Sequence, residues 1–263
     1  MNEFRLILAS ASPRRKDILE NHGISPVVMP SDWEETIPPE MECAPPEEIC
    51  TYLAYHKAKS VYEMIRKVGG TPAASPSAAA PPTTLSPIGL RTFVLGADTI
   101  VVCGKSVGKP RNESGLYEDI LDKSRTESGL CGKSAGKPSD ESDLCCEILG
   151  KPTDEADARR MLRLLRGRPH RVMTGVSLWE LPAGRNLTAY DISTVYFRDY
   201  PDETIEEYLR VEQPYDKAGS YAIQSFATGK YHPLAEKIDG DLENVIGLPM
   251  HLVRRMLDAM LQP

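Results

Sequence analysis

The chain has 263 residues, of which 41% are hydrophobic and 26% are charged, a composition typical of a globular protein large enough to bury a core. Its formal net charge of -7 argues against a dedicated surface for nucleic acid or for an anionic membrane, because both would repel an acidic face. The first apolar stretch is too short for a secretion signal or a membrane span. We therefore expect a cytoplasmic protein whose partners include neither nucleic acid nor a membrane.

The cysteines do not indicate a metal centre or a disulfide framework. The chain has six of them, with no CxxC pair and no histidine at zinc-ligand spacing. We expect reduced thiols without a shared role.

The first predicted elements are a strand and two helices. Residues 5–10 are an apolar run typical of a buried strand, and Ser12 followed by Pro13 is typical of a helix start. Gly23 predicts the end of that helix. A second helix is predicted over residues 46–68, where apolar side chains recur at helical spacing.

Two segments of unusual composition flank the next predicted strand. Residues 69–91 are mostly Ala, Pro, Ser and Thr, which predicts a disordered loop. Residues 92–102 are predicted to form a central strand that presents Asp98 at a bend. Residues 108–149 are a tandem repeat with a 14-residue period: Gly-Lys-Pro starts at positions 108 and 136 and again at 150, directly after the repeat, and a degenerate copy, Asp-Lys-Ser, starts at position 122. We interpret the repeat as a surface insertion that the fold can lose.

The remaining sequence completes a mixed α/β pattern. Thr153 is expected to cap a helix that Gly167 ends. The other predicted elements are strands over residues 170–180 and 188–197 and helices over residues 201–211 and 248–261.

The turn between the first strand and the first helix predicts an anion site. Free backbone N–H groups and the helix dipole favour an anion there, and Arg14 and Arg15 add forked guanidinium donors. Ser10 and Ser12 add hydroxyl groups. The alternative is a basic helix start that forms only surface ion pairs.

Several charged residues predict metal and phosphate chemistry. A carboxylate inside an apolar strand needs a cation or donors, so Asp98 is a candidate to hold Mg²⁺ or to activate water. Glu34 and Glu35 could supply a second carboxylate, and Lys57 and Lys151 could neutralise phosphate charge. The alternatives are an acid that bends the strand, a solvated acidic loop and surface lysines. Gln224 has the donor and acceptor needed to recognise a base edge.

Six motifs in order resemble those of the Maf family of nucleoside triphosphate pyrophosphatases. They are LILASASPRRKDIL, GADTIVV, GKPTDEADARRML, MTGVSL, DKAGSYAIQ and GDLENVIGLP. The resemblance implies a two-lobed α/β fold, similar to Maf and inosine triphosphatase proteins, with a mixed central sheet and an active-site cleft between the lobes. It also implies a divalent metal, Mg²⁺ or Mn²⁺, and a nucleoside triphosphate substrate that is cut to a monophosphate and pyrophosphate.

The resemblance carries the family's functional residues onto this sequence by position. Its catalytic residues fall on Asp98, Lys57 and Lys151, and its metal ligands fall on Glu35 and Asp98. Its substrate-binding positions fall on Ser10, Ser12, Arg14, Arg15, Thr99, Lys217 and Gln224.

The motifs are compatible with more than one substrate class and more than one placement of the functional lysine. Asp216-Lys217 before Ala-Gly, with Gln224, is similar to the branch that acts on dTTP and UTP. A methylated-guanine nucleotide pyrophosphatase and a non-catalytic nucleotide-binding regulatory protein are the other two hypotheses. Lys109 or Lys137 could take the position assigned to Lys151, and a homodimer is left open.

Overall fold

The computed structural model describes residues 4–41, 43–69, 91–104, 147–224 and 232–262. In chain order, its elements are β1 (Phe4–Leu8), α1 (Pro13–Asn21), β2 (Val27–Val28), η1 (Pro39–Met41), α2 (Pro46–Gly69), β3 (Arg91–Cys103), β4 (Glu147–Leu149), α3 (Glu155–Leu165), β5 (Pro169–Leu181), β6 (Asn186–Phe197), α4 (Asp202–Glu212), η2 (Ala218–Ser220), β7 (Ala235–Asp239), α6 (Leu242–Ile246) and α7 (Met250–Leu261). Among the helices of these residues, none is long and apolar enough to cross a membrane.

The strands form one seven-stranded sheet in the order β2-β1-β3-β5-β6-β7, with β4 paired to β3. Parallel pairs join β1 to β2 and to β3, and Leu8 lies opposite Leu95. The pairs β3 with β4 and β6 with β7 are antiparallel. The predicted α/β class and mixed sheet are therefore confirmed.

The chain divides into two compact units. The first comprises residues 1–98, 175–190 and 250–263, and the second comprises residues 99–174 and 191–249. Strands β3, β5 and β6 contribute residues to both units, and the division of β3 falls between Asp98 and Thr99. The cleft expected between two lobes stays a prediction.

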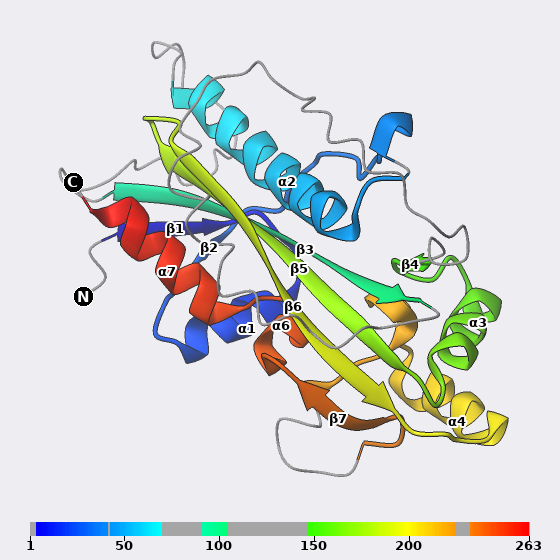
Figure 1. The fold of residues 1–263 in the computed structure, drawn as a ribbon. Helices are drawn as coiled ribbons and strands as arrows, with labels where there is room; N and C mark the ends of the chain where they lie inside the picture. The colour runs from blue at the N-terminus through cyan, green and yellow to red at the C-terminus, as the bar shows by residue number, and fades with distance from the viewer. Residues whose placement is uncertain (1–3, 42, 70–90, 105–146, 225–231, 263) are drawn as a thin grey trace, which may run out of the picture. The chain divides into compact units, whose positions relative to one another are not determined.

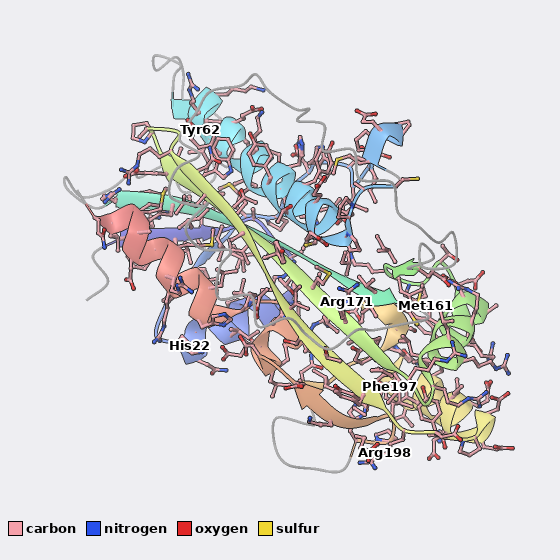
Figure 2. The ribbon with its side chains drawn as sticks, viewed as in Figure 1. His22, Tyr62, Met161, Arg171, Phe197 and Arg198 are labelled. Carbon is pink, nitrogen blue, oxygen red and sulfur yellow. The ribbon has the colours of Figure 1, made fainter. Side chains whose placement is uncertain are left out.

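In the first unit, helices cover both sides of the strands (Figure 1): α2 runs along one side, and α1 and α7 lie on the other. Its core packs strand residues such as Val94 and Trp179 against Val61 of α2. Tyr62 of α2 points toward the turn between β5 and β6 (Figure 2), where its hydroxyl donates to the Pro182 carbonyl over 3.3 Å. The apolar stripe that predicted α2 is thus the surface that faces the strands.

The predicted start of α1 is confirmed, because Ser12 is the N-cap residue and Pro13 is the first residue of the helix. The Ser12 side chain, however, makes no capping hydrogen bond to the backbone N–H groups of the first turn. The predicted bend at Asp98 is wrong, because β3 continues without interruption from Arg91 to Cys103.

The second unit has a separate core, in which α3 and α4 pack together. Met161, Leu162 and Leu165 of α3 are buried in it, as the helical spacing predicts. The predicted cap at Thr153 is wrong by one residue: the Asp154 carboxylate accepts from the backbone N–H of Asp157 at 2.8 Å. An Asp side chain caps α3 in the way that a Ser or Thr would.

The end of the predicted insertion belongs to the sheet. The structure describes only residues 147–149 of the segment 108–149, and these form β4. Leu149 lies opposite Val101, and it is 1% exposed within the core of the second unit. The last three residues of the predicted insertion thus pair with β3. Residues 108–146, with Lys109 and Lys137, lie outside the described residues, so the insertion stays a prediction.

We predict that deleting residues 106–146 yields a folded protein. This deletion keeps β4 and leaves Gly104-Lys105 as a two-residue hairpin loop between the paired Cys103 and Glu147. Deleting residues 108–149 instead puts Val107 in place of the buried Leu149 and shortens the turn by one residue. We expect the free energy of unfolding of the 108–149 deletion protein to be lower than that of the 106–146 deletion protein by at least about 1 kcal/mol, the value of one buried methylene.

Urea unfolding of the two deletion proteins measures this difference. Equal stability would show that β4 contributes nothing to the core of the second unit, and it would contradict the prediction.

Candidate active site

Three of the predicted residues in the first unit meet at one ammonium group. Lys57 Nζ donates to Asp98 Oδ1 and lies 2.8 Å from Glu35 Oε1. Lys57 and Asp98 are each 8% exposed, whereas the Glu35 side chain is 47% exposed. A charge this deeply buried needs such partners, because an unpaired buried charge is strongly unfavourable. Two carboxylates therefore converge on a single cation position.

Two glycines allow α2 to come close enough for this contact. A Cβ at Gly96 of β3 would lie 2.5 Å from the Ala54 carbonyl oxygen, and one at Gly175 of β5 would lie 2.2 Å from the Cys50 carbonyl oxygen. Glycine inside a strand permits this close approach of another backbone. Side chains two residues apart share a face of a strand, so Asp98 lies on the same face as Gly96 and meets the helix at Lys57.

The turn between β1 and α1 lies in the same unit, and it contains the residues of the predicted anion site. The Ser10 hydroxyl is buried and accepts from Arg15 Nη1 at 3.0 Å and from the backbone N–H of Ser12 at 3.3 Å. Burial lowers the pKa of Arg15, Asp98 acts in the opposite direction, and Arg14 lowers this pKa again. Arginine keeps its charge under such shifts, so a guanidinium stands within electrostatic range of Asp98.

A thiol also lies near the carboxylates, but its chemistry is suppressed. Cys50 of α2 is fully buried, and its Sγ donates to the Glu47 carbonyl. Burial, followed by the negative charges of Asp98 and Glu47, raises the pKa of Cys50 to about 12. The thiolate is the reactive form of cysteine, so Cys50 is not a nucleophile at neutral pH.

The remaining predicted residues lie in the second unit. Thr99 Oγ1 shares a hydrogen bond of 3.0 Å with Thr174 Oγ1, and Thr174 donates to the Asn244 carbonyl over 2.9 Å. Asn244 is fully buried and donates to the Val172 carbonyl and to Ser193 Oγ. This network ties Thr99 to α6, which contains Asn244.

Lys151 and Lys217, the two predicted site lysines of the second unit, stand on neighbouring segments. The backbone N–H of Gly219 donates to the Gly150 carbonyl over 3.0 Å, which joins the strand end before Lys151 to the segment after Lys217. Gly219 has a φ of +67°, and a Cβ there would lie 3.0 Å from the Val101 side chain, so glycine is favoured at this position. Lys151 is exposed, Lys217 pairs with Asp216 at 2.5 Å, and Gln224 is half-buried.

The structure thus brings Ser10, Arg15, Glu35, Lys57 and Asp98 together in the first unit. The contribution of Gly96 and Gly175 was not predicted, although an isolated glycine within a strand pattern is a signal for close backbone approach. Trp33 and His56, whose rings stack with centroids 5.0 Å apart, were also not predicted to contribute to the site.

These features define a class of protein. It is an α/β protein in which a strand-to-helix turn with two arginines stands near a lysine paired with two carboxylates. Donors for phosphate oxygens and ligands for a divalent cation are both present.

Comparison with known proteins places the chain within that class. The sequence model of the Maf-like protein family matches residues 5–130 and 139–260. The chain is 33% identical over 246 residues to a protein of Alkaliphilus oremlandii, with 94% of this chain and 91% of the relative covered. It is 33% identical over 257 residues to a protein of Dictyoglomus thermophilum (97% and 95% covered) and over 253 residues to one of Thermococcus gammatolerans (95% and 94% covered). All three relatives are named dTTP/UTP pyrophosphatase.

The chain therefore belongs to the Maf family. The resemblance identified from its motifs is confirmed.

Proposed function

We propose that this protein hydrolyses nucleoside triphosphates between the α- and β-phosphates, with dTTP and UTP as preferred substrates. The observation that carries the proposal is the contact of Lys57 with both Asp98 and Glu35. The names of the relatives support the reaction and the pyrimidine preference. The products are the nucleoside monophosphate and pyrophosphate.

The predicted site residues have separate roles in this reaction. Asp98 accepts a proton from the water that attacks the α-phosphorus, while Lys57 holds one oxygen of its carboxylate in place. Arg14 and Arg15 bind the phosphate oxygens and neutralise the charge that grows on the leaving pyrophosphate. Lys151 is assigned to the same neutralisation, and Thr99 and Lys217 to substrate binding.

A divalent cation fits the residues present. Carboxylate oxygens are the ligands that Mg²⁺ and Mn²⁺ prefer, and Glu35 and Asp98 already converge on one positive charge. These two residues would hold the ion, whose charge would neutralise phosphate oxygens and lower the pKa of a bound water.

Pyrophosphate release from a panel of nucleotides tests the proposed function. The panel contains dTTP, UTP, ATP, GTP and a methylated GTP, each with Mg²⁺ and with excess EDTA. We expect the largest kcat/KM with dTTP and UTP and no release in EDTA. A preference for methylated GTP would favour the guanine alternative. Nucleotide binding by calorimetry without turnover would favour the regulatory protein.

We predict that Gln224→Glu weakens the preference for pyrimidines. The substitution removes the amide donor and leaves only acceptors at a half-buried position. The loss of one hydrogen bond of about 1.4 kcal/mol corresponds to about a tenfold fall in kcat/KM for UTP. The exposed Gln213→Glu is the matched control, with an unchanged preference expected. An unchanged UTP to GTP ratio in Gln224→Glu would remove Gln224 from base recognition.

A further inference from the structure

The loop that carries Glu35 has no helix or strand of its own. Residues 29–38, between β2 and η1, are irregular in the structure. A carboxylate on such a segment can stay beside Lys57 only if other contacts fix the loop. Two sets of contacts join this loop to α2.

The first set is a chain of hydroxyl contacts. Ser31 Oγ and Ser60 Oγ share a hydrogen bond of 2.6 Å. Ser31 Oγ also accepts from the backbone N–H of Trp33 at 3.1 Å, and Ser60 Oγ donates to the Lys57 carbonyl over 3.2 Å. The start of the loop is thereby joined to the helical turn that presents Lys57.

The second set is aromatic. The Trp33 ring stacks on His56 with centroids 5.0 Å apart and an interplanar angle of 20°. The Trp33 ring also meets Tyr52 edge-on at 6.1 Å, and Tyr52 and His56 contact each other at 4.3 Å. Offset and edge-on arrangements are the favourable ones for aromatic rings.

The spacing of these residues places contacts on two sides of α2. Tyr52, His56 and Ser60 follow one another at intervals of four residues and so line one side of the helix. This side contacts the loop. Ala54 and Ala58 lie on the side against Gly96. Lys57 follows His56 in the sequence. Its ammonium group contacts Glu35 from the loop and Asp98 from β3.

We infer that Trp33 is a positioning residue that holds Glu35 beside Lys57 through its stack on His56. This inference rests on the proposed function, because it assigns to Trp33 an effect on the divalent cation held by Glu35 and Asp98. Trp33 itself touches neither substrate nor metal in this assignment. Removing its ring frees the loop and weakens cation binding without changing Asp98.

A double-mutant cycle tests the inference in the full-length protein. Trp33→Ala is expected to raise the Mg²⁺ concentration for half-maximal pyrophosphate release by about 10-fold to 100-fold, the usual effect of losing a residue that orients a metal ligand. In a Glu35→Gln background, Trp33→Ala should cause no further change. Trp33→Phe keeps a ring and should lie close to wild type. The neighbouring Glu34→Gln is the control and should match wild type.

Amide hydrogen exchange supplies a readout that does not depend on turnover. In Trp33→Ala, the amides of residues 31–35 should exchange faster, and those of residues 52–60 should keep their wild-type rates. Faster exchange along α2 as well would make Trp33 a structural residue of the helix, which would overturn the inference. Additive effects of Trp33→Ala and Glu35→Gln would also overturn it. Absence of pyrophosphate release from wild-type protein would instead overturn the proposed function alone.

Discussion

Asp98→Asn is expected to lower kcat for UTP by about 10²-fold to 10⁴-fold, the usual cost of removing a general base. The amide has nearly the same shape as the carboxylate, and its oxygen can still accept from Lys57. The Lys57 ammonium also keeps Glu35 as a partner at 2.8 Å. The fold should therefore survive, and the loss should appear in kcat, measured by pyrophosphate release at saturating Mg²⁺.

Asp202→Asn is the matched control for this substitution. Asp202 also pairs with cations, since Arg163 and Arg166 both contact it, but it lies on α4 in the second unit and half of its side chain is exposed. We expect wild-type kcat from this variant. Circular dichroism of both proteins checks that they are folded. A folded Asp98→Asn protein with near wild-type kcat would contradict the proposed role of Asp98.

Gly175→Ala should also have a large effect, through the position of α2. The new methyl group would lie 2.2 Å from the Cys50 carbonyl oxygen and 2.8 Å from the Thr51 nitrogen. Both are backbone atoms, so rotation of a side chain cannot relieve the overlap, and the helix must move. We expect a loss of about 1–3 kcal/mol in the free energy of unfolding, as for other overpacked cores. Movement of α2 also displaces Lys57, so kcat should fall more than stability alone explains.

Gly150→Ala provides the stability control, because a Cβ at Gly150 meets nothing within 4 Å. Its midpoint of thermal unfolding should equal that of the wild type. Gly96→Ala, with a contact of 2.5 Å to Ala54, should behave like Gly175→Ala. If Gly175→Ala kept both wild-type stability and wild-type kcat, the close approach of α2 would not position Lys57.

The sequence predicted the elements whose signals are local. α2 was predictable because a long apolar stripe at helical spacing matches a single buried surface, and the structure has it over Pro46–Gly69. β3 was predictable from its continuous apolar run, and the acid within that run identified Asp98 as a residue that needed a partner.

Contacts between distant parts of the chain could not be predicted in the same way. β4 has three residues, and it pairs with β3 across a segment whose repeats resemble one another, so composition alone placed it in the insertion. The stack of Trp33 on His56 joins a loop to a helix with no periodic signal. The contact of Lys57 with Asp98 depends on how closely α2 approaches Gly96, which is a property of packing.

The two faces of α2 should also tolerate change differently as the sequence diverges. On the strand side, the helix backbone lies against glycines, so no replacement at Gly96 or Gly175 preserves the contact, and these positions should remain fixed among active proteins. On the loop side, the contact is made by the side chains of Trp33 and His56, which other pairs of similar size can replace. Natural variation can therefore adjust the position of Glu35 while Asp98 stays where it is.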